Sequence, residues 1–190
     1  METAATRATS LVRALADVKS IDEDALSLNL RHIDLCEIVE PIVRMLDRAS
    51  ERHPIVLAVE TPPVIVSGDG ERLGRVVENL ITNAIKYSPG GGAIEVRLRR
   101  DNEFAVLTVA DSGIGIPAHA RERVFDIGFR TAEAARVAPG MGLGLHIAAE
   151  VVRRHGGRIE AEARDTGGAV FSVRLPIAAD AAAVTGYGAA

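Results

Sequence analysis

The stretch that most limits what this chain can fold into is a long amphipathic pattern near its middle. Apolar residues recur there at the i, i+3, i+4, i+7 and i+8 spacing of a helix with one buried face: Leu73, Val76, Val77, Leu80, Ile81, Ala84 and Ile85. The pattern predicts a helix from about Asp69 to Tyr87, ended by the turn-forming run at 88–92. Such a helix needs a second layer of structure to cover its apolar face.

A seam of polar side chains follows one flank of this predicted helix. At roughly 100° per residue, Asn79, Asn83 and Lys86 lie within about 60° of one another, whereas Glu78 points to another side. Amide oxygens bind hard cations and an ammonium binds phosphate, so the seam suits a metal–phosphate ligand. An ordinary surface flank explains the helix by itself equally well, and the remaining sequence has to decide between the two.

The second layer comes from short segments with strand patterns, separated by turn residues. They are residues 28–33, 55–60, 64–66, 94–99, 104–110, 158–163 and 169–175. Further helices are predicted from Asp34, where Pro41 should kink the helix or delay its start, from Pro117 to Phe125, and from Gly140 to Gly156. The predicted class is α+β: a two-layer α/β sandwich with a mixed, largely antiparallel sheet and its helices packed on one face.

The same patterns divide the chain into three parts. We expect residues 31–177 to form one domain, residues 1–30 to be the end of a helix followed by a linker, and residues 178–190 to be a disordered Ala/Gly tail. A chain of 190 residues is long enough to bury the core of such a domain.

Composition narrows the possible functions. The net charge is −4 and the basic residues are not clustered, which argues against nucleic-acid binding. The single Cys36 excludes an internal disulfide and a cysteine metal cluster. No apolar run approaches the roughly 20 residues of a membrane helix, and no signal-peptide pattern is present. We therefore expect a cytoplasmic segment without membrane contact, whether or not a parent protein is membrane-anchored.

Two glycine-bearing segments extend the candidate site. Asp111 ends a predicted buried strand and is followed by Gly113 and Gly115, which let a flat ligand approach the backbone. A buried carboxylate needs donors, and the exocyclic amine of adenine is one that fits; the alternative is that Asp111 caps the following turn. The second segment, residues 140–145, offers free amides at a helix start, as a phosphate site does, although close packing also explains its glycines.

Between these segments lies a weakly patterned stretch, residues 130–140, which we predict to be a loop with the composition of a lid. Competing motifs are missing: the sequence has no P-loop, no Gly-x-Gly-x-x-Gly fingerprint, no His-Glu-x-x-His and no Gly-x-Ser-x-Gly elbow. The five histidines are not paired at metal-ligand spacing, and each is expected at the surface or at a helix end rather than in catalysis.

Taken in order, these segments resemble the catalytic and ATP-binding domain of sensor histidine kinases, in the GHKL ATPase superfamily. The resemblance covers about residues 31–176. Residues 79–87 resemble the N box, residues 111–116 the G1 box, residues 125–130 the F box, and residues 140–145 the G2 box. Each box alone is modest evidence, and four in this order are strong evidence.

The resemblance assigns roles along the seam helix. It implies that Asn83, with Asn79, holds the magnesium that bridges the phosphates, that Lys86 touches phosphate, and that Tyr87 packs near the nucleotide. In other GHKL ATPases a glutamate four residues before the magnesium asparagine activates water. Here that position is Asn79, which suits a kinase because a kinase should not transfer phosphate to water.

The remaining roles fall on the other boxes. Asp111 would accept from the adenine amine, and Arg130 would reach the γ-phosphate. The other implied nucleotide-binding residues shape the pocket, line it, hinge the lid or donate amides: Gly113, Gly115, Ile116, Phe129, Gly140, Gly142, Leu143, Gly144 and Leu145.

The implied function is a protein histidine kinase domain of a two-component system, which binds ATP and Mg2+. The resemblance also implies as partners a response regulator and a histidine-bearing dimerisation domain, in its own parent chain or in trans. None of the five histidines lies in the phosphoacceptor context, so we do not expect this chain to autophosphorylate alone. Two alternatives remain: an anti-sigma-type serine kinase of the same superfamily, and a non-catalytic module that binds nucleotide or docks a partner.

Overall fold

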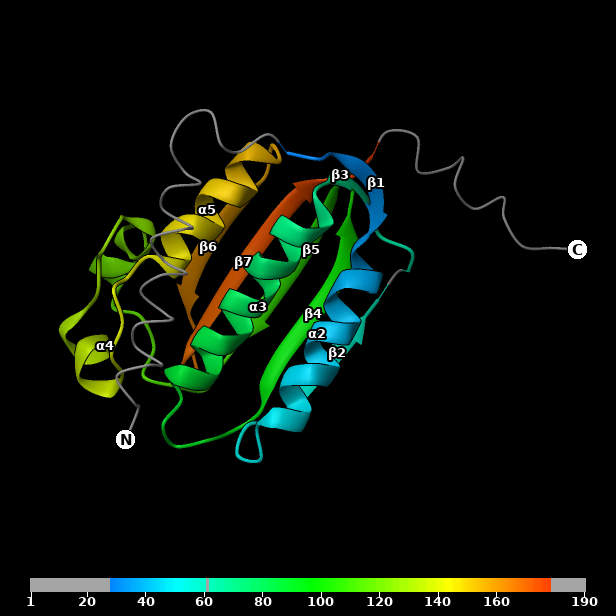
Figure 1. Cartoon of the computed structure of the whole chain (residues 1–190). Helices are drawn as coiled ribbons and strands as arrows, with labels where there is room; N and C mark the ends of the chain where they lie inside the picture. Colours follow the sequence, from blue (N-terminus) through cyan, green and yellow to red (C-terminus); the bar gives the residue numbers. More distant parts are fainter. Residues whose placement is uncertain (1–27, 61, 179–190) are drawn as a thin grey trace, which may run out of the picture.

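The computed structural model describes residues 28–60 and 62–178, and Figure 1 shows their arrangement. Seven strands form two sheets: β1 (Arg31–Asp34), β2 (Ile55–Val59), β3 (Ile65–Gly68), β4 (Ile94–Asp101), β5 (Phe104–Ala110), β6 (Arg158–Ala163) and β7 (Ala169–Pro176). The helices are α2 (Leu35–Ala49), α3 (Gly70–Lys86), α4 (Ala132–Val137) and α5 (Gly144–Arg154), with short 3-10 turns η1 (Ala118–Ala120) and η2 (Arg123–Phe125).

The main sheet has the strand order β2-β4-β5-β7-β6. The β2–β4 pair is parallel and the other three pairs are antiparallel, so the sheet is mixed and largely antiparallel. Helices α2, α3 and α5 lie across one face of it (Figure 1). The predicted two-layer sandwich is therefore confirmed. A second sheet pairs β1 with β3, and a bridge between Val66 and Ile177 ties it to the end of β7.

The core lies between these layers and follows the two periodicities of the sequence. Leu80 and Ile81 of α3 are fully buried, and they meet the inward-facing Ile94, Val96 and Leu98 of β4, which are buried completely as well. The outward residues of β4 alternate with them and carry charge, as expected for a strand with one covered face. This packing fixes α3 against the sheet, so that its polar flank has a defined place.

Local sequence explains where the two longest helices begin. The Asp34 carboxylate accepts from the amide of Cys36 and caps α2, and the Asp69 carboxylate accepts from the amide of Arg72 and caps α3. Helix α2 starts at Leu35 in spite of Pro41, so the predicted delay of its start is wrong. The reason is that the Asp34 cap and the buried Leu35 and Cys36 hold the first turn in place.

Two other predictions need correction. Ala178 was expected in a disordered tail, but it is buried and its amide donates to the carbonyl of Ile65, so the ordered domain extends through it. Of the five histidines, His53 is buried away from any helix end, with both ring nitrogens hydrogen-bonded, so the expected position is wrong for it. His155 is also buried, but it ends helix α5, and a helix end was one of the two expected positions. The predicted segments 1–27 and 179–190 lie outside the described residues.

Among the described residues, no helix combines the length and the apolar character needed to span a membrane.

Candidate nucleotide site

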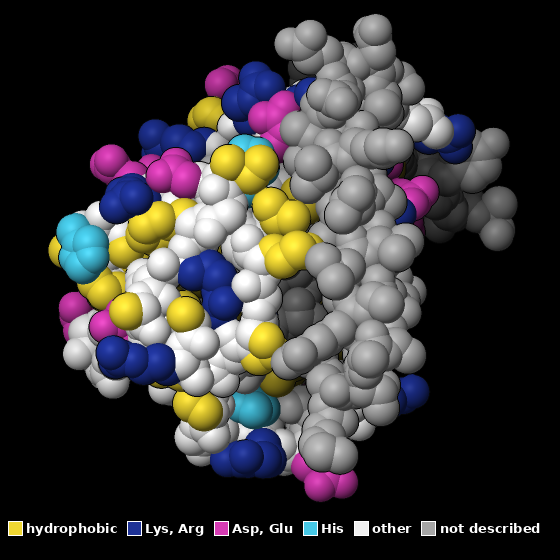
Figure 2. Space-filling model, turned by 60° about the vertical axis from the view of Figure 1, so that its left-hand side comes forward, with side chains coloured by type: hydrophobic (Ala, Val, Ile, Leu, Met, Phe, Trp, Pro, Cys, Tyr) yellow, Lys and Arg dark blue, Asp and Glu magenta, His cyan; other side chains and the backbone are white. Residues whose placement is uncertain are grey.

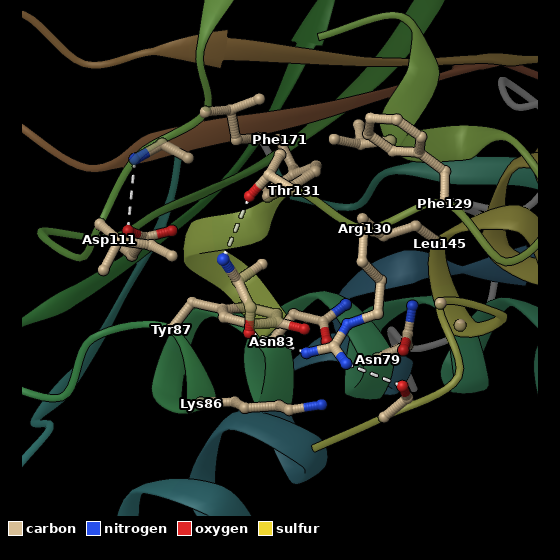
Figure 3. Close-up of a pocket in the computed structure, with 18 of the residues that line it drawn as sticks. Asn79, Asn83, Lys86, Tyr87, Asp111, Phe129, Arg130, Thr131, Leu145 and Phe171 are labelled. Atoms are coloured by element: carbon tan, nitrogen blue, oxygen red, sulfur yellow. Dashed lines mark hydrogen bonds between the residues drawn. The ribbon is translucent and has the colours of Figure 1, made fainter. Parts of the chain in front are cut away.

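A cavity of about 250 Å³ opens between α3, the end of β5, the lid segment and the start of α5 (Figure 3). Its α3 wall is built by Asn79, Asn83, Lys86 and Tyr87. The apolar stripe of α3 is buried in the core, so the polar flank has to lie at the edge of the packed layer, where it meets the cavity. The predicted seam is therefore one wall of a single pocket. Glu78, by contrast, is exposed on another side of the helix.

Asp111 lies at the opposite end of the cavity, just after β5, and is only 4% exposed. Its Oδ1 accepts from the amides of Gly113 at 2.8 Å and Ala169 at 3.2 Å. Burial raises the pKa of this carboxyl, and the two amide hydrogen bonds oppose that rise. Both bonds go to Oδ1, which leaves the second oxygen, Oδ2, as an acceptor for a ligand.

The cavity near Asp111 is mainly apolar, as a base-binding pocket must be. The apolar side chains that line the cavity include Ile116, Val124, Phe129, Leu145, Ala169 and Phe171. The Phe171 ring packs edge-on against Phe125, with ring centroids 6.4 Å apart. The carbonyl of Phe125 in turn accepts from Nδ1 of His146 on α5, at 2.9 Å. These contacts join the F-box-like segment, α5 and β7 into one wall.

Glycines are required at two positions around Asp111 where backbone segments of the chain approach each other closely. A Cβ on Gly113 would lie 2.1 Å from the carbonyl oxygen of Tyr87, the last residue of the α3 wall. Gly168 has φ +99°, and a Cβ there would lie 2.0 Å from the carbonyl oxygen of Asp111. Both positions therefore exclude any side chain. Gly113 contributes to the site by this close approach and by its amide, and it does not itself line the cavity.

The end of the cavity away from Asp111, where the sequence predicts phosphate binding, carries the basic side chains. Lys86 and Arg130 both line it, together with the glycine-rich run that precedes α5. A Cβ built on Gly140 would lie 2.8 Å from the ammonium nitrogen of Lys86, and the carbonyl of Gly140 accepts from Arg130 at 2.9 Å. The two cationic side chains therefore both lie beside Gly140. Figure 2 shows basic side chains recessed among hydrophobic and uncharged atoms on this side of the molecule.

The structure of the lid segment, residues 130–140, differs from the one predicted. Residues 130–140 were expected to be a loop, but residues Ala132–Val137 form α4, so that expectation is wrong. The hydroxyl of Thr131 caps α4 by accepting from the amide of Ala134. No residue of α4 is buried, which is why the sequence shows no apolar periodicity there. Helix α5 likewise begins at Gly144, later than the predicted start at Gly140.

All but one of the residues predicted for the site line this cavity, Gly113 being the exception. The structure adds lining residues that sequence reasoning missed: Ile114, Val124, Thr131, Ala134, Met141, Ala169 and Phe171. Met141 and Ile114 sit inside segments that were already singled out, and their neighbours could have pointed to them. Ala169 and Phe171 read as ordinary strand residues, and only the pairing of β5 with β7 brings them to Asp111.

Comparison with known proteins agrees with this geometry. Residues 68–179 match the family described as histidine kinase-, DNA gyrase B-, and HSP90-like ATPase. The signal transduction histidine-protein kinase/phosphatase MprB of Mycolicibacterium smegmatis is 38% identical over 161 residues, which are 84% of this chain and 32% of MprB. The sensor histidine kinase TmoS of Ectopseudomonas mendocina is 35% identical over 169 residues, 87% of this chain and 17% of TmoS.

A solved structure of the mycobacterial sensor histidine kinase MprB superimposes with a TM-score of 0.69 at 34% identity, covering 78% of this chain and 97% of that one. The fold and the cavity together define an ATP-binding domain of the kind found in sensor histidine kinases. The family match covers more than half of the chain, and the chain belongs to the histidine kinase-, DNA gyrase B-, and HSP90-like ATPase family. It spans less than a third of the length of either curated relative.

Proposed function

We propose that this chain is the catalytic domain of a two-component sensor kinase, which transfers the γ-phosphate of Mg-ATP to a histidine outside the five that it carries. The observation that supports this most is the convergence of a buried carboxylate, an amide-rich helix and a glycine-rich run on one cavity. The phosphoacceptor domain, in the same parent chain or in trans, and a response regulator are the partners that this proposal requires.

The base end of the cavity would bind adenine. Asp111 offers one free carboxylate oxygen to the exocyclic amine, while the apolar side chains around Phe171 cover the ring faces. Because the carboxylate is held from behind by the amides of Gly113 and Ala169, its position is set before the nucleotide arrives. The enzyme would therefore spend little binding energy on orienting this acceptor.

The residues of the phosphate end fit a metal that arrives with the nucleotide. The described residues contain no cluster of three or more His, Cys, Asp or Glu side chains that could bind a cation alone. Magnesium needs no such cluster, since it is commonly held by one or two protein oxygens and by substrate phosphates. The amides of Asn83 and Asn79 line the cavity and would supply those oxygens. A magnesium ion there would neutralise phosphate charge.

The side chains of the protein would position the phosphates and neutralise the remaining charge on them. Lys86 and Arg130 flank Gly140, so phosphate oxygens placed there would meet a cation from each side. Asn79 stands one helical turn before Asn83 and has no acidic group with which to activate water. The site thus favours transfer to another side chain over hydrolysis.

The proposal is tested by incubating the chain with γ-labelled ATP and a separately expressed helical hairpin that carries a phosphoacceptor histidine. We expect label on the hairpin only when the chain, ATP and Mg2+ are all present. Asn83→Ala should abolish transfer, whereas Thr82→Ala, on the same helix but outside the cavity, should retain it. Binding of ATP without transfer to any hairpin tried would favour the non-catalytic module, and label on serine would favour the serine kinase.

A further inference from the structure

Arg130 makes an unusual set of contacts for a residue expected to bind phosphate. Its guanidinium donates to three backbone carbonyls of the lid: Ala134 at 2.7 Å, Gly140 at 2.9 Å, and Ala138 in a short hydrogen bond. Ala134 lies within α4, and Ala138 is the residue that follows its last turn. Arg130 therefore lies at the C-terminal end of α4, where the carbonyl of Ala134 also accepts from the amide of Ala138, the residue that ends the helix.

Helix α4 depends on this contact to an unusual degree. It has six residues, and none of them is buried. A helix of that length is unstable in isolation, and without buried side chains packing cannot compensate. What holds it is one group at each end: the Thr131 hydroxyl at the start, and the Arg130 guanidinium at the finish. Removing either group should let the adjoining turn fray.

Arg130 also faces the phosphate end of the cavity. It lines the same space as Asn83 and Lys86 (Figure 3). Its partner Gly140 lies against the ammonium group of Lys86. Its Nε is buried without a hydrogen-bond partner among the described residues. The guanidinium is thus held by uncharged carbonyls next to a place where an anion would bind. A phosphate carries a negative charge and can accept from the planar guanidinium through two parallel hydrogen bonds, so it attracts Arg130 more strongly than uncharged carbonyls do.

We propose that Arg130 is a latch with two alternative sets of partners: it caps α4 when no triphosphate is bound, and it leaves the α4 carbonyls for the terminal phosphate when a triphosphate binds. The last turn of α4 would then lose its cap. A nucleoside diphosphate lacks the terminal phosphate and would leave the latch in place. The state of α4 would therefore report which nucleotide occupies the site. This inference rests on the proposed nucleotide binding.

Hydrogen exchange of residues 135–138 tests the latch in the whole chain. We compare the chain without nucleotide, with Mg-ADP, and with a magnesium-bound, non-hydrolysable β,γ-imido analogue of ATP. The expected result is faster exchange in the analogue complex than in the ADP complex, with the amide of Ala138 most affected, because it bonds to the carbonyl of Ala134 that Arg130 also holds. Equal exchange in the two complexes would overturn the proposal.

Three variants separate the latch from a simple charge effect. Arg130→Ala should speed exchange at 135–138 without nucleotide and lower the ratio of triphosphate to diphosphate affinity about tenfold, the loss expected for charge-assisted hydrogen bonds to one phosphate. Arg130→Lys keeps the charge but lacks the planar fork of donors that lets the guanidinium span the carbonyls of Ala134, Ala138 and Gly140, so it should speed exchange while retaining most of that ratio. Arg136→Ala removes an equal charge from an exposed position of α4 and should change neither quantity.

The outcomes also separate this inference from the proposed function. If the chain binds both nucleotides but exchange at 135–138 does not distinguish them, the latch is wrong and ATP binding stands. If Arg136→Ala lowers the affinity ratio as much as Arg130→Ala does, general electrostatics explains the effect and the latch is again wrong. If neither nucleotide binds, the proposed function fails and the latch fails with it.

Discussion

The side-chain amide of Asn79 lies directly against Gly144, the first residue of α5. A Cβ built on Gly144 would come within 2.4 Å of the Asn79 Oδ1 atom. Asn79 is therefore in contact with the start of the helix that follows the lid, and its Nδ2 is buried without a partner among the described residues. The contact couples the α3 wall of the cavity to the glycine-rich run, because neither can shift without moving the other.

Gly144→Ala should accordingly push α5 away from Asn79. We expect ATP affinity measured by calorimetry to fall at least about tenfold, since the added methyl group overlaps the side-chain amide of Asn79, which must then turn into the cavity where the nucleotide would bind. The matched control is Gly74→Ala in the middle of α3, where a Cβ would make only ordinary contacts of 3.6 Å with Ile38 and Ile42. That variant should bind ATP normally and should be about 0.5–1 kcal/mol more stable, because alanine replaces glycine within a helix.

The buried carboxyl of Asp111 makes nucleotide binding depend on pH. Burial raises its pKa above the ordinary aspartate value of 3.8, so the carboxyl becomes protonated at a higher pH than an exposed aspartate would. A protonated carboxyl is a poorer acceptor for the adenine amine, and affinity should fall as pH is lowered through this raised pKa. Asp111→Asn should cost about 1–3 kcal/mol of binding at neutral pH.

Calorimetric titrations with ADP over a series of pH values check this prediction. The nucleotide titrates in the same way in every experiment, so the informative quantity is the difference in affinity between the wild-type protein and Asp111→Asn. That difference should shrink at acid pH. A constant difference, or no difference at all, would place the adenine contact elsewhere.

The carboxylate of Glu150 on α5 contributes to stability in a defined pH window. It accepts from Arg153 at 2.7 Å and from Arg154 at 2.6 Å, and chiefly the Arg153 contact, with Arg154 adding to it, lowers its pKa from 4.5 to about 2. A lowered carboxyl pKa stabilises the fold fully above pH 4.5, and this stabilisation is lost as pH falls toward 2.

Glu150→Gln should therefore destabilise the protein by about 1 kcal/mol at pH 7, a value reduced to allow for the exposure of Arg153 to solvent. Urea unfolding at pH 7 and at acid pH measures the change. The deficit should disappear near pH 2, and Glu78→Gln, at an exposed position of α3, serves as the control. A deficit that persists at pH 2 would show that the ion pairs are not its cause.

His155 ties the end of α5 to the start of α3. Its Nδ1–H donates to the carbonyl of Val151 at 2.7 Å, and its Nε2 accepts from the amide of Asp69 at 2.9 Å. Replacing it with leucine leaves the part-buried amide of Asp69 without its acceptor, whereas the carbonyl of Val151 keeps the backbone amide of residue 155 as a donor. The loss of this one acceptor should cost about 1–3 kcal/mol in urea unfolding. His32→Leu changes an exposed histidine and should have a much smaller effect. Equal effects of the two substitutions would contradict this role for His155.

Much of the site could be predicted because its signals are local. The predicted α3 helix differs from the observed one by about one residue at each end, because apolar periodicity, the Asp69 cap and the glycine run after Tyr87 all agree. Helix α4 could not be predicted in this way. Its stability comes from the Arg130 guanidinium and the Thr131 hydroxyl, and neither leaves an apolar pattern in the sequence.

Contacts between distant parts of the chain also could not be predicted from the sequence. The amide of Ala169 donates to Asp111 across 58 positions of sequence, and this contact exists only because β7 pairs with β5. Ala178 was missed for the same reason, since its hydrogen bond to the carbonyl of Ile65 joins residues that are far apart in the sequence. Strand order decides such contacts, and a single sequence does not encode it in any local pattern.

The hydrogen bond from Ala169 to Asp111 also has a consequence for synthesis of the protein. On the ribosome, α3, β5, the lid and α5 all emerge before β7 does. A nascent chain that stops short of Ala169 would already carry Lys86, the asparagines and the glycine-rich run that line the cavity, yet Asp111 would lack one of its two donors and the cavity would lack Phe171. Nucleotide would be unable to assist the early stages of folding, and the ability to bind it would arise with the last strand.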